Sequence, residues 1–457
     1  MSTTARPADA RLAPPDPSAP SLVRGLSLLG AVALVVGNMV GTSMYTLPAS
    51  LAQSVGPLGI TAWGLTAFGY LGVALVYASL GARYPRTGGP YIFAREAFGD
   101  FAAFLSVWLY WISAVIGNAG IVIGVVAYAE SFVPAVSASH PLLRLAIAQF
   151  LLWTFCGLNV VGVKHSARVQ IGILIVNLGG LVILLGASTH AIAPANYRPF
   201  APHGWASLAT GTALICWAYS GVETATVPAE EVDRPVVTIG RGTMIGYVIA
   251  TIVFLLAAIT VAGVLPNDQV ASSARPLALV VERGVGHLGS EIISICAIVA
   301  GLGTLNGWLL VSGRAPFSAA QDGLFFRRMA DVHPRFRTPA VGLVISTLIG
   351  SAMLFLMLSK TLLDTFNFIA LIAVWATLVP HLISAAAELS LARRKNSIYP
   401  AADRRRAQIV APLAFVAMTY FVYGAGAEIG RWGFGLLSAG ILAYGFLRVG
   451  QENSSER

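Results

Sequence analysis

The chain of 457 residues is 56% hydrophobic, has a mean hydropathy of +0.75 and is only 11% charged, whereas soluble domains carry about 25% charged residues. This composition excludes an ordinary soluble protein and predicts an integral membrane protein. The net charge of +9 could attract nucleic acid, but the placement of the basic residues gives a different explanation below. Residues 1–27 are rich in Ala, Pro and Ser and include acidic residues, which predicts a flexible cytoplasmic tail rather than a signal peptide.

Apolar segments long enough to cross a bilayer follow one another along the rest of the chain, each of about 20 residues or more. Breaker-rich stretches such as 83–90 and 193–204 separate them. The sequence therefore predicts an all-α integral membrane protein with 12 transmembrane helices. Their expected ranges are 28–52, 58–82, 98–132, 142–160, 169–188, 206–230, 242–265, 289–313, 339–359, 362–388, 409–426 and 433–449.

The basic residues indicate the orientation of these spans. If the N-terminus is cytoplasmic, 23 of the 29 Lys and Arg residues fall in cytoplasmic segments and 6 in external ones. Lys and Arg resist translocation, so the asymmetry predicts a multi-pass protein of the cell (inner or plasma) membrane with both termini in the cytoplasm. Membrane topology thus accounts for the basic composition, and no nucleic acid partner is expected.

The first span contains an unusual stretch, GNMVGTSMYT, at residues 37–46. Gly37 and Gly41 are poor helix formers, and Thr42 and Ser43 can bond their own backbone, so local unwinding costs little here. Non-helical backbone survives within a membrane only where it is buried or lines a cavity. Unwinding exposes N–H groups that suit a carboxylate and C=O groups that suit an ammonium group. A glycine-rich packing face is the alternative interpretation.

The sixth span carries a matching interruption in CWAYSGVETATVPAEE, residues 216–231. Pro228 follows Gly221 by seven residues, just as Pro48 follows Gly41 by seven in the first span. Broken helices at positions one and six predict a LeuT-like five-plus-five inverted repeat, with a binding site between the halves.

Glu223 lies deep in this sixth span. A carboxylate at the bilayer centre costs at least about 2.5 kcal/mol, so it normally faces a cavity or a partner. We therefore expect a role for Glu223 in proton coupling, with a structural helix-to-helix contact as the alternative. The three cysteines and seven histidines show no metal-ligand spacing, so neither a metal nor a cofactor is expected.

Several stretches resemble the amino acid–polyamine–organocation transporters, and among them the bacterial basic amino acid/polyamine antiporters such as the arginine/agmatine antiporter. The similarity runs in order from about residue 28 to 449. It is carried by GNMVGTSMYTLPA at 37–49, YPRTGGPYIFAREAFG at 84–99, LYWISAVIGNAG at 109–120, WAYSGVET at 217–224 and GTLNGWLLVSGRAPFSAAQDGLF at 303–325.

The resemblance implies a substrate site and a gate. The substrate carboxylate would meet the N–H groups of Thr42 and Ser43 beside Gly41, and its ammonium group the carbonyls of Met39, Trp217 and Ser220. A guanidinium end would reach Asn118 and Trp308. Ser113 and Ala114 would line the same pocket, and Tyr110, Trp217, Asn38 and Glu223 would serve gating or the pH response.

Three departures from the family pattern affect the substrate. Ser43 replaces a glycine of the first-helix motif, and Ala370 and Leu371 stand where the arginine antiporter offers serine. Thr304 and Asn306 could compensate beside Trp308. No second intramembrane acid is evident, which favours a basic amino acid over a symmetric diamine.

The expected organisation is a cytoplasmic tail (1–27), a ten-helix transport core (28–388), a basic cytoplasmic loop (389–408), helices 11 and 12 (409–449) and a cytoplasmic C-terminal tail (450–457). Helices 11 and 12 could form a homodimer in the lipid bilayer. The predicted function is antiport of an arginine-like amino acid against a related amine or amino acid. A proton-coupled symporter of neutral amino acids and a polyamine/diamine exchanger remain alternatives. An enzyme, a channel and a nutrient sensor fit less well, because the chain has no hydrolase motif and no signalling domain.

Overall fold

The computed structural model describes residues 25–455, apart from residues 131, 134–138, 162–165 and 360. Nearly all of the predicted N-terminal tail (1–27) and residues 456–457 of the C-terminal tail lie outside the described residues. The described chain is α-helical, and its only β-type pairing is an isolated bridge between Leu26 and Val232. The prediction of an all-α fold is therefore confirmed.

Eleven helical segments within the described residues are long and apolar enough to cross a membrane. The prediction of a multi-pass membrane protein is thereby confirmed. The long continuous helices are α3 (Gly59–Arg83), α5 (Asp100–Ala129), α6 (Pro141–Val161), α7 (Ser166–Ser188), α9 (Pro235–Val264), α12 (His287–Gln321), α13 (Ala340–Leu354), α14 (Leu362–Arg393), α15 (Ala401–Gly424) and α16 (Gly426–Ser455).

The first predicted span is divided in two. α1 (Leu28–Met39) ends before Val40 and Gly41, and α2 (Thr42–Ser54) begins directly after them. Val40 and Gly41 have non-helical backbone angles, although both residues are buried. The C-terminal end of α1 and the N-terminal end of α2 therefore lie next to each other inside the bundle.

The sixth predicted span is shorter as a helix than the sequence suggests. α8 (Leu208–Tyr219) covers only 12 residues, and two 3₁₀ segments follow, η6 (Thr224–Thr226) and η7 (Ala229–Glu231). Gly221 has a φ of 117°, which favours glycine and stops the helix here. This segment is not among the eleven candidate spans, so the count of 12 stays a prediction.

Three shorter helices that the sequence did not predict connect the spans: α4 (Pro90–Phe98), α10 (Asn267–Ala271) and α11 (Pro276–Val285). α4 begins with a proline after Gly89 and ends at Gly99, both glycines with positive φ, so strong local signals bound it. Several boundaries also differ from expectation. α9 begins before the predicted 242, α12 and α14 end after the predicted 313 and 388, α15 begins within the predicted basic loop, and α16 continues to Ser455.

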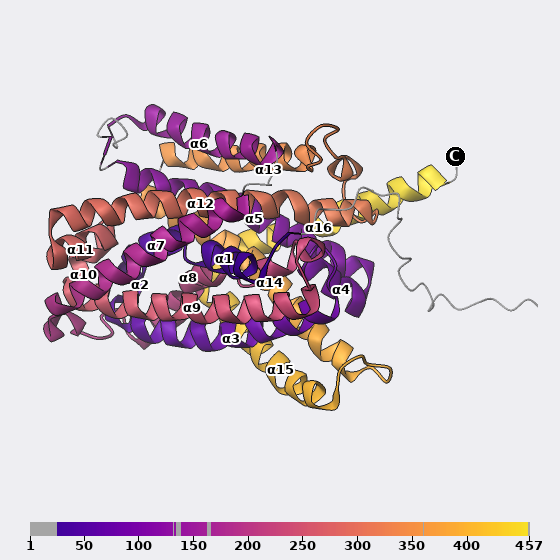
Figure 1. The fold of residues 1–457 in the computed structure, drawn as a ribbon, viewed down its shortest axis with the longest axis horizontal. Coiled ribbons are helices and arrows are strands. Elements are labelled where there is room, and N and C mark those ends of the chain that lie inside the picture. Colours follow the sequence, from indigo (N-terminus) through magenta and orange to yellow (C-terminus); the bar gives the residue numbers. More distant parts are fainter. Residues whose placement is uncertain (1–24, 131, 134–138, 162–165, 360, 456–457) are drawn as a thin grey trace, which may run out of the picture.

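The broken segments lie in the middle of the bundle. Figure 1 shows α1 and α8 near the centre, with α6 and α13 together along one edge and α15 at the opposite edge. α5 packs against α12 and α14, whereas α3 and α1 both pack against α9. The long helices thus form a frame around the two interruptions.

Close approach of α1 and α9 depends on two glycines of α9. A Cβ atom at Gly242 would lie 2.8 Å from Cβ of Ala31, and one at Gly246 would lie 2.6 Å from Cγ1 of Val35. Gly242 and Gly246 are four residues apart and therefore share one face, the small-residue pattern that lets membrane helices pack closely.

This packing predicts that Gly246→Leu destabilises the protein by about 1–3 kcal/mol, the usual cost of overpacking. The measurement is thermal unfolding of the detergent-solubilised protein. Gly64→Leu on α3 is the matched control, because a Cβ there meets no atom within 4 Å. Equal melting temperatures for the two variants would show that α1 and α9 do not depend on this contact.

Candidate functional site

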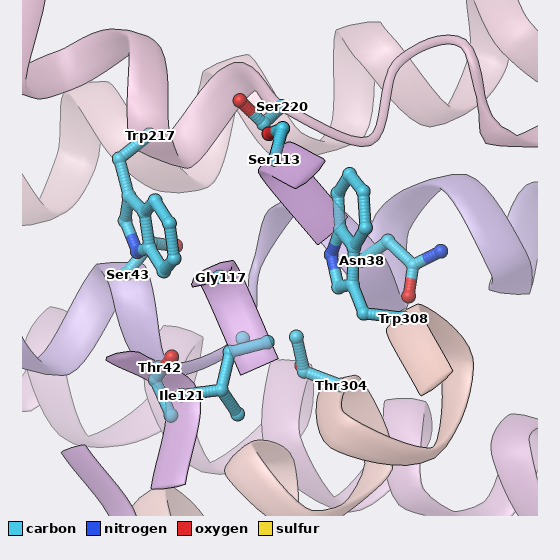
Figure 2. A pocket seen from close by; sticks show the side chains of 11 residues that line it. Asn38, Thr42, Ser43, Ser113, Gly117, Ile121, Trp217, Ser220, Thr304 and Trp308 are labelled. Atoms are coloured by element: carbon cyan, nitrogen blue, oxygen red, sulfur yellow. The ribbon is translucent and has the colours of Figure 1, made fainter. Parts of the chain in front are cut away.

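A small cavity of about 20 Å³ lies where the two broken segments meet α5 and α12. Figure 2 shows that side chains from four separate parts of the chain converge on it. The lining residues are Asn38, Gly41, Thr42, Ser43, Ser113, Gly117, Ile121, Trp217, Ser220, Thr304 and Trp308.

One wall of the cavity is the N-terminal end of α2. Among the described residues, the backbone N–H groups of Gly41, Thr42 and Ser43 have no hydrogen-bond acceptor. More than nine in ten buried backbone groups are paired in folded proteins, so three unpaired N–H groups beside a cavity indicate a ligand site. The positive end of the helix dipole favours an anionic group such as a carboxylate there.

Gly41 is needed for this arrangement because of its neighbour on α12. A Cβ atom at Gly41 would overlap the side chain of Thr304. Any larger residue would push the start of α2 away from α12 and change the direction of the free N–H groups.

The carbonyl groups at the end of α1 are already paired. Thr304 Oγ1 lies 2.8 Å from the Gly37 carbonyl and 2.9 Å from the Ala300 carbonyl of its own helix, so its single proton is shared between them. Asn177 Nδ2 donates to the Val40 carbonyl at 2.6 Å. Ser43 Oγ donates to the Met39 carbonyl at 2.7 Å. A carbonyl oxygen can accept a second hydrogen bond, so Met39 remains able to receive an ammonium group.

The second break leaves free carbonyl groups instead. Ser220 N–H closes the last turn of α8 on Cys216, but Gly221 N–H donates to Glu223 Oε2 at 3.1 Å rather than to the helix. Within the described residues, the Trp217 carbonyl therefore accepts no backbone hydrogen bond. The C-terminal end of a helix carries partial negative charge, which suits an ammonium group.

The two breaks touch directly. A Cβ atom at Gly221 would lie 2.9 Å from Asn38 Cβ and 3.1 Å from the Asn38 carbonyl carbon. The positive end of α2 and the negative end of α8 thus face the same cavity, which is complementary to a group that carries both charges.

Two tryptophans bound the cavity on opposite sides (Figure 2). Trp217 meets the ring of Phe366 edge-on, with ring centroids 5.8 Å apart. Trp308 packs beside Tyr110, with centroids 6.4 Å apart. Gly117 of α5 leaves room for the Trp217 ring, since a Cβ there would already be 3.4 Å from it.

The structure brings most of the predicted substrate residues together. Met39, Ala114 and Asn118 are buried but do not line the cavity, whereas Gly117, Ile121 and Thr304 line it and were not in the predicted set. The predicted residues that line the cavity are Gly41, Thr42, Ser43, Ser113, Trp217, Ser220 and Trp308, and Asn38 of the predicted gate joins them.

Hydrogen bonds fix Ser113 against α14, because its Oγ donates to the Ala373 carbonyl at 2.8 Å and also contacts Thr377 Oγ1. Asn38 differs, since its side-chain oxygen and nitrogen both lack a partner among the described residues. An unpaired buried amide is costly, so Asn38 offers one donor and one acceptor to whatever fills the cavity.

Glu223 lies outside the cavity lining, with its side chain fully buried. Tyr110 OH donates to Oε1 at 3.0 Å, and His381 Nε2 lies 3.9 Å from Oε2. The predicted gate residues Tyr110 and Glu223 therefore contact each other. His381 and Asn177 were missed from the sequence, although each is a polar residue inside an apolar span and that position is itself a functional signal.

These features define a polytopic membrane protein with a central cavity between two interrupted helices. The chain belongs to the amino acid permease family, whose model matches residues 26–431. That family consists of transporters, so the protein is a membrane transporter and not an enzyme.

Three relatives extend the comparison. A putative arginine/ornithine antiporter of Bacillus subtilis is 29% identical over 91% of this chain and 95% of its own. An arginine/ornithine antiporter of Pseudomonas aeruginosa is 28% identical over 88% of this chain and 86% of its own. A cadaverine/lysine antiporter of Escherichia coli is 30% identical over 80% of this chain and 83% of its own.

The paired carbonyls at the end of α1 lead to a stability prediction. Thr304→Val keeps the side-chain shape but removes the donor to Gly37, so the buried carbonyl loses a partner at a cost of about 1–3 kcal/mol. Thermal unfolding of the purified protein measures this loss.

Thr66→Val is the matched control. The Thr66 hydroxyl is buried without a hydrogen-bond partner in the described part of the chain, so its removal should leave the melting temperature unchanged or raise it. A Thr304→Val protein as stable as the Thr66→Val protein would contradict the structural role given to Thr304.

Proposed function

We propose that this permease exchanges a basic amino acid of the arginine class for a related amino acid or amine by alternating access. The observation that carries the proposal is a pair of helix ends at one cavity that have no partner in the described part of the chain: three N–H groups at Gly41–Ser43 and the carbonyl of Trp217. This pair is complementary to the carboxylate and the ammonium group of an amino acid. The names of the relatives support the same class of substrate.

The side chain of the substrate extends towards Trp308, whose indole face can stack on a planar guanidinium group. Asn118 follows the lining residue Gly117 in α5, and its buried Oδ1 has no hydrogen-bond partner among the described residues; in this proposal it accepts a hydrogen bond from the substrate after a side-chain movement. Thr304 supplies a further polar group beside Trp308. Asn306 does not line the cavity, and its side chain accepts a hydrogen bond from Asn159 Nδ2 at 2.9 Å.

The lining favours an amino acid over a symmetric diamine. No carboxylate is among the lining residues that the structure describes, so the second ammonium group of a diamine would find no counter-charge. An amino acid, in contrast, brings its own carboxylate to the N–H groups of α2.

In this proposal the chain has 12 spans arranged as a five-plus-five inverted repeat. α1 with α2 and α8 with its 3₁₀ continuation occupy positions one and six. Both termini face the cytoplasm, because 23 of the 29 Lys and Arg residues then lie on the cytoplasmic side. Homodimers form through α15 and α16, whose outer face exposes Trp432, Phe434 and Phe446.

Alternating access requires that the cavity opens to the side of the protein where the N-terminal segment lies. Contacts between several segments close the cavity on that side. Arg314 Nε lies 2.8 Å from Glu231 Oε1, and the N–H groups of Gly25 and Leu26 donate to the Glu231 carbonyl at 3.0 Å. Gly88 N–H also donates to the Val227 carbonyl at 3.0 Å. These contacts join the N-terminal segment, η7, the loop before α4 and α12, so they separate when the cavity opens on that side.

Asn38, Tyr110, Trp217 and Glu223 respond to the substrate in this cycle. Substrate drives the change only by the difference in its affinity for the two conformations. Asn38 contacts both breaks, and Tyr110 connects Trp308 with Glu223, so movement at the cavity reaches the buried carboxylate directly.

The proposal predicts obligatory exchange. Purified protein in liposomes that are preloaded with unlabelled arginine or ornithine should take up labelled arginine, whereas empty liposomes should not. Equal uptake into empty liposomes, driven by an inward proton gradient, would instead establish a symporter. The absence of arginine flux in every condition would exclude a basic amino acid as substrate.

Trp308 provides the test of the side-chain pocket. Trp308→Leu should weaken arginine binding by about 5- to 30-fold, because a desolvated cation–π contact contributes about 1–2 kcal/mol. Isothermal titration calorimetry measures this affinity. Trp153→Leu on the outer face of α6 is the control, since that indole is exposed and far from the cavity lining. Unchanged affinity in Trp308→Leu would show that the guanidinium group binds elsewhere.

A further inference from the structure

A row of buried polar side chains extends from Glu223 along the face of α14 that packs against α3. His381, Ser384 and Glu388 are separated by three and four residues and therefore share one face of α14. All three side chains are buried. Ionisable groups inside membrane spans are costly and normally serve a function, and neither substrate binding nor the gate described above uses this row.

His381 occupies the position between Glu223 and α3. Its Nε2 lies 3.9 Å from Glu223 Oε2 and has no hydrogen-bond partner among the described residues. Its Nδ1 lies 2.8 Å from Tyr77 OH, which in turn lies 3.2 Å from Ser384 Oγ. These contacts form a series of groups that carry protons: Glu223, His381, Tyr77 and Ser384. Only the distance between Glu223 and His381 is longer than a hydrogen bond.

A cluster of polar side chains around Glu388 continues the row towards the surface. Glu388 accepts hydrogen bonds from Ser79 Oγ at 2.7 Å and from Tyr399 OH at 2.6 Å. Arg83 donates to Ser79 Oγ at 2.7 Å and pairs with Asp403, whose side chain is 35% exposed. The group therefore reaches solvent at the end of α14 where α15 begins.

The two parts of the row are one helical turn apart. Ser384 and Glu388 differ by about 6 Å along the axis of α14, given a rise of about 1.5 Å per residue. A water molecule hydrogen-bonded to both side chains would join the two parts of the row.

Other groups around His381 do not provide a competing charge. From α3 it meets the rings of Tyr70 and Tyr77, with centroids 5.9 and 5.3 Å away, and from α15 the ring of Phe421 covers Tyr70. Tyr110 of α5 bonds to Glu223 on the other side. In the part of the chain that the structure describes, Glu223 forms no ion pair with an arginine or lysine, so His381 is its only basic neighbour within 4 Å.

We infer that His381, together with Tyr77 and Ser384, transfers protons between Glu223 and the solution at the Glu388 end of α14. The inference rests on the proposed function, in which Glu223 responds to the substrate through Tyr110, and it adds that this response includes a change in the protonation of Glu223. The row thereby connects this buried carboxylate with the partly exposed Asp403 beside the end of α14.

The transfer is a sequence of proton exchanges without oxidation. A proton that enters at Glu388 passes through a bridging water molecule to the Ser384 hydroxyl and then to the Tyr77 hydroxyl, each of which accepts one proton and releases its own. The released proton binds Nδ1 of neutral His381, and the proton on Nε2 passes to the Glu223 carboxylate. A closure of about 1 Å brings Nε2 and Oε2 into hydrogen-bond distance for the last step.

Time-resolved infrared spectroscopy of the purified full-length protein tests this route, because the protonated-carboxyl band after a pH jump needs no substrate. Glu223→Gln assigns the band of Glu223. His381→Gln should slow its appearance by about 100-fold or more, as expected when a positioned proton-transfer group is lost. His287→Gln is the matched control, since that side chain is 78% exposed at the start of α12.

Tyr77→Phe gives a second test if His381→Gln fails to fold, because it keeps the ring and removes only the hydroxyl; it should slow the band in the same way. Protonation of Glu223 at the wild-type rate in both variants, or a Glu223 band that does not respond to pH, would overturn the inference. The liposome exchange assay tests the proposed substrate independently of the proton route. If the infrared result is as expected but arginine is not transported, only the proposed substrate is refuted.

Discussion

Lipid offers no hydrogen bonds, and this constraint explains the centre of the molecule. Each interruption of a membrane helix leaves backbone N–H and C=O groups that must find partners inside the protein or in a ligand. The chain interrupts two helices side by side. It satisfies the carbonyls at the end of α1 with Asn177, Thr304 and Ser43. No described residue pairs with the N–H groups at the start of α2 or with the carbonyl of Trp217. The unsatisfied groups are the ones that face the cavity.

The surrounding helices maintain this asymmetry. Small residues let the elements approach closely, as at Gly242 and Gly246 between α9 and α1, and at Gly41 against Thr304. Long helices such as α5 and α14 present Ser113, Tyr110 and His381 from fixed positions. A rigid frame around two locally unwound segments allows the segments to move while the site geometry stays defined, which is the requirement for alternating access.

Local sequence signals predicted much of this arrangement. Hydropathy identified the long helices, and the glycines at 41 and 221 marked interruptions, whereas Gly37 lies within α1. The family resemblance supplied residues such as Trp217 and Trp308, which the structure places on opposite sides of one cavity. It also supplied Ala114 and Asn118, which are buried behind the lining. Their assignment as substrate contacts stays a prediction.

Contacts between residues distant in sequence could not be predicted from these patterns. Asn177 pairs with Val40 across 137 positions, and His381 approaches Glu223 across 158. Such pairs depend on how whole helices rotate and cross, which a single-span pattern does not record. The short helix α4 was missed for another reason, since its nine residues are too few to give a clear apolar period.

The central claim is that the free backbone groups of the two breaks bind the charged ends of an amino acid. A cryo-electron microscopy structure of the protein with L-arginine tests it most directly. The account predicts the arginine carboxylate within hydrogen-bond distance of the N–H groups of Thr42 and Ser43, and the α-ammonium group at the carbonyl of Trp217. Arginine bound elsewhere, with these groups still unpaired or bonded within the protein, would contradict it.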